Sequence, residues 1–218
     1  MAAWPGGRYD PAVRSLGRGL FWIAAIFGAI GLLLHLFVFD AWLVPAGDPV
    51  FAVSIEPTLR PGDRILVQRG AVPHAGQLAR CTLSNGALVV GRVVGKRGDT
   101  VEVRDERAFV NGQAIASRHA CPVVTLPHPV TGREITLACA VEDNGAWTYS
   151  VLRAAQLPEA NRTAKVPPGM VYLLSDNRHF HQDSRDFGPV EEERCEHIVY
   201  RLWGESYADS SRRNNILW

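Results

Sequence analysis

The chain has 218 residues, 47% of them hydrophobic and 21% charged, which is the composition of an ordinary globular protein and leaves room for one main folded domain. Its formal net charge of +1 argues against the strongly basic surface that nucleic-acid binding requires. We therefore expect no nucleic-acid partner.

An apolar segment near the N-terminus is the first element in chain order. It runs from Leu20 to Phe39 without a formally charged residue. A helix needs about 20 apolar residues to cross the hydrocarbon core of a bilayer, so we predict a transmembrane helix over residues 20–39. A cleaved signal peptide is the alternative, because Val44-Pro45-Ala46 resembles a small-residue cleavage site. The apolar region of a signal peptide is only about 7–15 residues long, which favours the transmembrane helix.

Charges on the two sides of this segment predict its orientation. Arg8, Arg14 and Arg18 precede it, whereas Asp40 and Asp48 follow it. By the positive-inside rule, residues 1–19 should be cytoplasmic and residues 40–218 should form a body outside the cytoplasm. Membrane lipid is then a contact partner of the chain.

Short strand-like runs separated by turn signals make up most of the remaining sequence. The better strand candidates are Ile65–Gln68, Ala87–Val94, Thr100–Arg104, Ala108–Val110, Met170–Leu174 and His197–Trp203. Asn111-Gly112 and Asn144-Gly145 predict hairpins, because type I′ turns need a positive φ at both central residues. We predict a mostly β body in which residues 117–165, richer in Pro, Thr and polar residues, form a smaller inserted lobe.

Four cysteines, Cys81, Cys121, Cys139 and Cys195, have neither C-x-x-C spacing nor a partnering histidine pattern, so we predict no metal site. Outside the cytoplasm they can pair, and a Cys121–Cys139 disulfide would staple the inserted lobe. Four buried free thiols are the alternative. The polar C-terminal stretch that ends in Ile216-Leu217-Trp218 is predicted to be a frayed tail rather than a docking peptide.

Three segments carry the chemistry of the chain. The first is Ser54-Ile55-Glu56-Pro57-Thr58-Leu59 with Pro61-Gly62-Asp63, the second runs from Gly91 to Asp99, and the third comprises Ser175 to Arg178 and Asp183 to Val190. Taken singly, each could be a tight turn. In this order behind a membrane span, they resemble bacterial type I signal peptidase, the enzyme that removes signal peptides from exported proteins.

This resemblance covers the span and nearly the whole body except the inserted lobe. It implies a signal-peptidase-like β fold, a serine nucleophile, a lysine general base, no cofactor, and cleavage of preprotein signal peptides after small residues of an Ala-x-Ala type. It also implies that the protein lies in the bacterial inner (plasma) membrane.

Ser54 stands at the nucleophile position of the family. A serine hydroxyl is unreactive until a nearby base takes its proton, and Ser54 lies close behind the span, where a substrate still anchored in the bilayer could present its cleavage site. A capping or turn serine is the alternative. Extra sequence from Asp48 to Val53 lies where the family has a shorter join, and we expect it to reshape the substrate groove.

The expected base is missing. In the family the second segment begins Lys-Arg, and alignment through Arg92, Gly95 and Gly98 puts Gly91 at the lysine position. Lys96 lies five residues later, in a turn where it should face water and stay charged, so it is a poor substitute.

The third segment also departs from the family. A serine that hydrogen-bonds the catalytic lysine is replaced by His181. A lysine acts as a base only when burial lowers its pKa, whereas histidine titrates near neutral pH without such help. We predict that His181 is a relocated general base oriented by Asp183 or Asp176, a Ser-His-Asp arrangement, with His179 as the fallback base.

Further site residues follow from the resemblance. Arg92, Asp183 and Arg185 match an ion-pair group that supports the family's site, and Asp176 belongs to the same supporting set. Ala52 replaces a serine whose hydroxyl helps stabilise the developing oxyanion, and losing one such donor costs about 10²–10³ in rate. Ile55 replaces a methionine and should line the pocket for small residues together with Ala52.

Two functions are left open by the sequence. The first is a membrane-anchored serine endopeptidase that removes signal peptides. The second is a catalytically inactive or slow paralogue, in which His181 fills the void beside Gly91 and the protein binds signal-peptide-like segments. A self-cleaving repressor with Ser-Lys chemistry is disfavoured by the membrane span and by the lack of a basic DNA-binding module.

Overall fold

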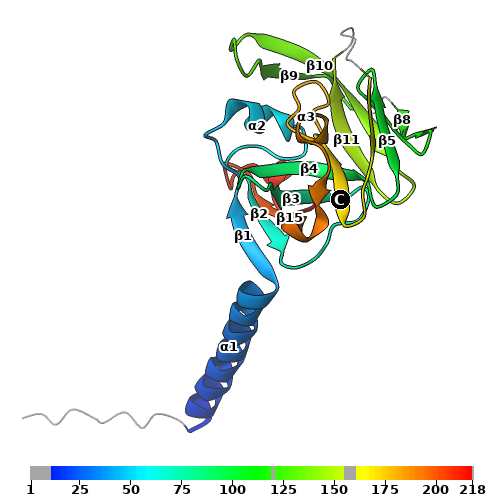
Figure 1. Cartoon of the computed structure of the whole chain (residues 1–218). Helices are drawn as coiled ribbons and strands as arrows, with labels where there is room; N and C mark the ends of the chain where they lie inside the picture. The colour runs from blue at the N-terminus through cyan, green and yellow to red at the C-terminus, as the bar shows by residue number, and fades with distance from the viewer. Residues whose placement is uncertain (1–10, 119–120, 155–160, 218) are drawn as a thin grey trace, which may run out of the picture. The chain divides into compact units, whose positions relative to one another are not determined.

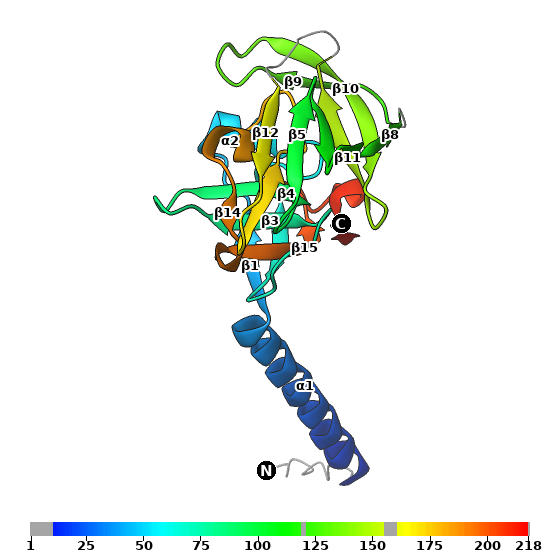
Figure 2. The ribbon, with the colours of Figure 1, turned by 45° about the vertical axis from the view of Figure 1, so that its right-hand side comes forward.

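The computed structural model describes residues 11–118, 121–154 and 161–217, with side chains described from Arg18 onward. The chain divides between Phe39 and Asp40 into an N-terminal unit and a body (Figures 1 and 2).

Helix α1, Pro11–Phe37, forms most of the N-terminal unit. Its stretch from Arg18 to Phe37 is long and apolar enough to cross a membrane. The helix stops short of Phe39, the last residue of the predicted span, because Phe39 begins a strand. Arg8 and the side chain of Arg14, on which the predicted orientation partly rests, lie outside the described residues.

The body is built on a large sheet with the strand order β1-β2-β15-β3-β4-β13-β14, and β16 pairs with β15. These strands are β1 Phe39–Leu43, β2 Arg64–Gln68, β3 Leu78–Thr82, β4 Leu88–Gly95, β13 Met170–Leu174, β14 Val190–Glu191, β15 Cys195–Trp203 and β16 Asn215–Ile216. The long late strand β15 pairs antiparallel with both β2 and β3, two strands from the early part of the chain.

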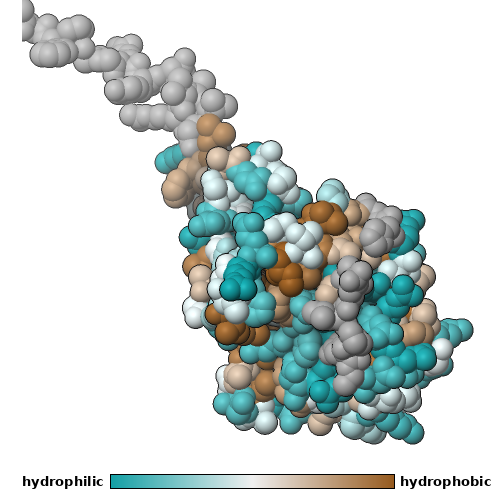
Figure 3. Space-filling view, turned by 90° about the horizontal axis from the view of Figure 1, so that it is seen from above, coloured by the Kyte–Doolittle hydropathy of each residue, from teal (hydrophilic) through white to brown (hydrophobic). Residues whose placement is uncertain are grey.

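Two smaller sheets complete the described body. One has the order β12-β5-β6-β7, and in the other β10 pairs with β8, β9 and β11. Their strands are β5 Thr100–Arg104, β6 Arg107–Val110, β7 Gln113–Ala114, β8 Ala116–Arg118, β9 Val124–Pro127, β10 Glu134–Asp143, β11 Thr148–Arg153 and β12 Arg162–Lys165. The sheet of the lobe thus spans 116–153, while β12 pairs with β5. Seen from above, the body is largely hydrophilic with separate apolar patches (Figure 3).

The predicted mostly β fold with one N-terminal apolar helix is confirmed. All six strand candidates overlap strands, namely β2, β4, β5, β6, β13 and β15. Asn111 and Gly112 have φ of 52° and 80° in the two-residue turn between β6 and β7, as predicted. Asn144-Gly145 also lies in a hairpin, but the loop between β10 and β11 is longer, and of this pair Gly145 alone has a positive φ, 90°.

The prediction of a frayed C-terminal tail is wrong for the described residues. Ile216 belongs to β16, which pairs with β15, and Leu217 is only 5% exposed. Leu217 belongs to the core cluster that also holds Phe51, Ile55 and Leu59. The apolar end therefore packs against the body, and this packing buries the Leu217 side chain away from water. Trp218 lies outside the described residues.

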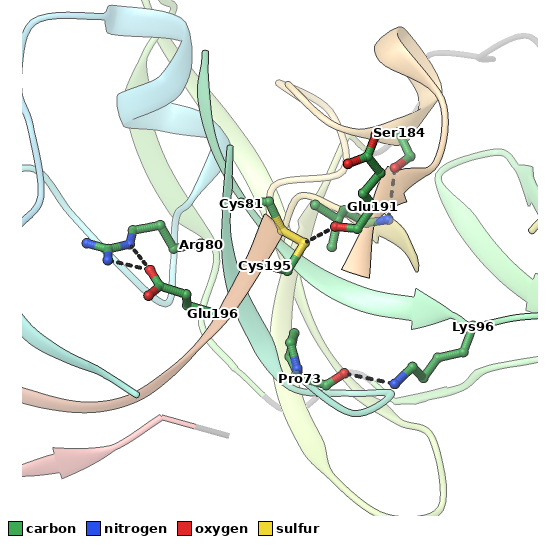
Figure 4. Close-up of a disulfide and its surroundings, with 9 residues drawn as sticks. Pro73, Arg80, Cys81, Lys96, Ser184, Glu191, Cys195 and Glu196 are labelled. Atoms are coloured by element: carbon green, nitrogen blue, oxygen red, sulfur yellow. Dashed lines mark hydrogen bonds and ion pairs between the residues drawn. A yellow bond between two sulfur atoms is a disulfide. The ribbon is translucent and has the colours of Figure 1, made fainter. Parts of the chain in front are cut away.

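Two disulfides connect the cysteines. Cys81–Cys195 joins β3 to β15, with the Arg80–Glu196 ion pair beside it on the same two strands (Figure 4). Cys121–Cys139 lies in the inserted lobe, as the sequence suggested. The alternative of free thiols is therefore wrong.

Candidate active site

Ser54 is the last residue of a short helix, α2, Pro49–Ser54. The Asp48 carboxylate caps this helix by accepting the N–H groups of Val50 at 2.8 Å and Phe51 at 3.2 Å. Proline fits the first helical position because its missing N–H would have no partner there. The extra sequence before Ser54 is thus a capped helical turn.

The hydroxyl of Ser54 is buried and already bonded. The residue is 1% exposed, and Oγ donates to the carbonyl of Phe51 at 2.9 Å. Among the described residues, this is the hydrogen bond that the hydroxyl makes. Serine side chains at helix ends commonly bond to a preceding carbonyl in this way.

Asn177 holds the backbone on which Ser54 sits. Its N–H donates to the carbonyl of Ser54 at 3.1 Å, and its Nδ2 donates to the carbonyl of Val53 at 3.0 Å. Its Oδ1 accepts the N–H groups of His179 and Phe180 at 3.2 and 3.0 Å. One buried amide therefore fixes both the nucleophile segment and the turn that follows it. Asn177 belongs to the third segment, but no role for its side chain was predicted.

Asp176 connects all three segments. Its carboxylate accepts Nε and Nη2 of Arg92 at 2.8 and 2.7 Å and the hydroxyl of Thr58 at 2.5 Å. The Arg92 and Asp176 side chains are 0% and 1% exposed. Burial lowers the pKa of Arg92, but the Asp176 carboxylate more than offsets it, so the pKa of Arg92 lies above its ordinary value.

A second buried ion pair lies beside it. Asp183 accepts Nε and Nη2 of Arg185 at 3.0 and 2.8 Å, and it caps helix α3, Ser184–Phe187. Burial raises the pKa of the Asp183 carboxyl, but the Arg185 guanidinium and the Ser175 N–H outweigh it and hold this pKa below its ordinary value. Because Asp176 and Asp183 are both occupied by arginine, their carboxylates act as structural partners in this structure.

Gly91 lies in β4 without an empty channel beside it. A Cβ at this position would lie 3.1 Å from Leu173 Cβ and 3.2 Å from the carbonyl oxygen of Leu174. Strand β13 therefore closes over the place where a lysine side chain would begin, and the His181 imidazole is not among the atoms nearest to it. The void that the sequence analysis placed beside Gly91 is absent at its first carbon.

His181 lies beside two carboxylates, Asp186 and the predicted partner Asp183. Nδ1 lies 2.9 Å from Asp186 Oδ2, on α3, and the imidazole side chain is 21% exposed. Ligand atoms of His181, Asp183 and Asp186 lie within 4.8 Å of one another. Since Arg185 already neutralises Asp183, this group is better explained as a histidine–carboxylate contact than as a metal site.

The other residues considered as bases lie in separate surroundings. His179 Nδ1 lies 2.9 Å from Glu106 Oε1, a partner that the sequence did not suggest. Lys96 Nζ donates to the Pro73 carbonyl at 3.2 Å (Figure 4). It also lies 3.9 Å from Glu192, the first residue of a short 3-10 helix.

The two residues expected to line the substrate pocket differ in burial. Ile55 is 3% exposed and packs in the core cluster with Val44 and Leu59. Ala52, on α2, is half-buried.

Comparison with known proteins places the chain in a family. Residues 19–202 match the family model described as signal peptidase, peptidase S26. The chain belongs to the signal peptidase family. It is 27% identical over 186 residues to Signal peptidase I V of Bacillus subtilis, covering 82% of this chain and 95% of that relative. It is 28% identical over 157 residues to Signal peptidase IB of Staphylococcus aureus, covering 69% and 73% of the two chains.

Membership of the signal peptidase family confirms the resemblance inferred from the three segments. The three segments lie together in the structure, because Asp176 and Asn177 of the third segment contact the first and second segments directly.

Proposed function

We propose that this member of the signal peptidase family is a membrane-anchored serine endopeptidase that removes N-terminal signal peptides, with Ser54 as the nucleophile. The observation that carries the proposal is the convergence on Ser54. Asn177 holds the Ser54 backbone, and Asp176 joins Arg92 to Thr58 in the same buried network. Such a network fixes the position of a backbone segment, which a nucleophile requires.

His181 is the proposed general base. The Asp186 carboxylate at Nδ1 favours the tautomer with the proton on Nδ1, which leaves Nε2 as the proton acceptor. For reaction, the Ser54 hydroxyl must leave the Phe51 carbonyl and meet Nε2 within hydrogen-bond distance, a contact that often forms only when substrate is bound.

The proposed reaction is acyl transfer. Oγ of Ser54 attacks the scissile carbonyl as His181 takes the hydroxyl proton. The oxyanion is stabilised by the Ser54 N–H, which must leave the last turn of α2 to reach it, without help from a hydroxyl at Ala52. His181 then gives the proton to the leaving amine, and water releases the acyl-enzyme. Cleavage follows small residues of an Ala-x-Ala type, with Ala52 and Ile55 beside the pocket.

The proposed location is a bacterial plasma membrane, with residues 1–19 cytoplasmic and the body outside. The Cys81–Cys195 and Cys121–Cys139 disulfides support this orientation, because disulfides persist in oxidising compartments and are rare in the cytosol. Preprotein signal peptides and membrane lipid are the proposed partners.

A second candidate function is a non-cleaving or slow signal peptidase paralogue that binds signal-peptide-like segments. Two observations favour it: the Ser54 hydroxyl is bonded to Phe51, and β13 closes over Gly91. In this case the buried network would preserve a binding surface instead of a reaction centre.

Cleavage of a preprotein with an Ala-x-Ala site by the purified full chain tests both candidates. The parent should cut, Ser54→Ala should not, and His181→Ala should lose most of the rate, whereas the control variant Lys96→Ala should retain it. Full activity of His181→Ala would exclude His181 as the general base. A parent that binds the preprotein without cleaving it would establish the second function.

A further inference from the structure

Glu106 occupies an unfavourable backbone conformation. It forms with Asp105 the two-residue turn between β5 and β6, whose φ values are 49° for Asp105 and 59° for Glu106. Such turns favour Asn followed by Gly, because a side chain with a Cβ is strained at positive φ. The neighbouring hairpin has the favoured pair, Asn111-Gly112, in a similar conformation. An unstrained turn between β5 and β6 would therefore contain Asn and Gly in place of Asp105 and Glu106.

The side chain of Glu106 gives the reason for its presence. The residue is 3% exposed although it lies at the tip of a hairpin, while its neighbour Asp105 is exposed. Oε2 accepts the N–H of Ala154 at 2.7 Å, and Oε1 lies 2.9 Å from Nδ1 of His179. A strained residue persists when surrounding contacts fix it, and such residues gather at functional sites.

His179 is in turn connected to the Ser54 segment. Its N–H donates to Asn177 Oδ1, and Asn177 holds the carbonyls of Val53 and Ser54. The next residue, Phe180, lies with its ring 4.5 Å from the His179 ring and packs against the core of the inserted lobe. The turn from Asn177 to Phe180 is therefore fixed at three places: on the nucleophile segment, on the β5–β6 hairpin and on the lobe.

We propose that Glu106 is a positioning residue of the active site. Its carboxylate keeps the proton of His179 on Nδ1 and holds the turn from Asn177 to Phe180 against the backbone of Ser54. The effect on cleavage rests on the proposed function, whereas the tautomer of His179 can be measured whether or not the protein cleaves.

Glu106→Gln tests this role because it retains a carbonyl oxygen for the Ala154 N–H but removes the charge that faces His179. In the full chain, the ¹⁵N chemical shifts of the His179 ring should change from the Nδ1-protonated pattern to that of a mixture of tautomers. The kcat for preprotein cleavage should fall about tenfold or more with little change in KM, because a displaced Asn177–Phe180 turn would misplace the Ser54 backbone. Asp105→Asn, in the same turn, is the matched control and should change neither quantity.

Glu106→Gly separates positioning from simple stabilisation. It relieves the strained turn but also removes the acceptor of the Ala154 N–H, and because these two effects on stability have opposite signs, the melting temperature should change little while kcat falls. Loss of stability in parallel with kcat would assign Glu106 a merely structural role. Unchanged ¹⁵N shifts of the His179 ring in Glu106→Gln would overturn the proposal. These shifts can be measured even if the parent does not cleave. A parent that does not cleave would contradict only the proposed function.

Discussion

At Asp183, burial and charge act on one carboxylate in opposite directions. Burial raises its pKa, but the Arg185 guanidinium and the Ser175 N–H lower it by more, so the folded-state pKa lies below the ordinary value. The folded chain therefore binds fewer protons at Asp183 than the unfolded chain does in acid. The resulting stability is fully present above about pH 3.9, the usual pKa of Asp, and is lost as the pH falls through the lower folded value.

Replacement of this carboxylate provides a residue-scale prediction. Asp183→Asn should lower the free energy of unfolding by about 3–5 kcal/mol at neutral pH, because it removes the negative charge that compensates the buried Arg185 guanidinium. The variant should also lose less stability than the parent between about pH 4 and pH 2. Denaturant unfolding across this pH range measures both effects, with exposed Asp105→Asn as the control. A parallel acid dependence in parent and variant would assign it to other carboxylates.

Single residues also show how far sequence reasoning reaches at a site. Ser54, Arg92 and Asp176 could be found because they belong to ordered motifs of short range. Glu106 could not, since its contact with His179 joins a hairpin tip to a loop 73 residues away. The closing of β13 over Gly91 was equally hidden, because strand packing, and not the identity of residue 91, decides whether a lost side chain leaves a void.

At the scale of elements, the strands were easier to predict than the segments around Ser54. The long strands have the alternating or continuous apolar pattern that marks a sheet. Helix α2 has only six residues, too few for a helical period, although Asp48 and Pro49 are typical of a helix start. The docked tail was missed because its burial depends on a core formed by distant residues.

The docked tail allows a paired prediction. Leu217 is 5% exposed and packs with Phe51 and Ile55, whereas neighbouring Ile216 is 55% exposed. Leu217→Ala should lower the free energy of unfolding by about 2 kcal/mol or more, and Ile216→Ala by less than about 0.5 kcal/mol. Since the same cluster supports α2, Leu217→Ala should also increase hydrogen exchange in residues 49–55. Equal effects of the two variants would mean that the tail is frayed in solution.

For the whole molecule, the division into a helical unit and a body leads to a prediction about anchoring. Deletion of residues 1–38 should leave the melting temperature of the body unchanged, because the body has its own cores. Cleavage of a preprotein in vesicles should fall strongly while cleavage of a soluble peptide persists, since tethering raises the effective concentration of the two partners to about the millimolar range. An unrelated apolar transmembrane helix fused to the body should restore the vesicle reaction. A body that unfolds without α1 would contradict the independence of the two units.

The position of β15 between β2 and β3 has a consequence for folding during synthesis of the chain. Cys81 and Cys195, which join β3 to β15, are separated by 114 residues, so the centre of the large sheet cannot assemble until almost the whole chain has been synthesised. Until then β2 and β3 lack the partner that lies between them and the early chain has no closed core. A nascent chain that has not yet reached β15 therefore cannot form the native order of the large sheet.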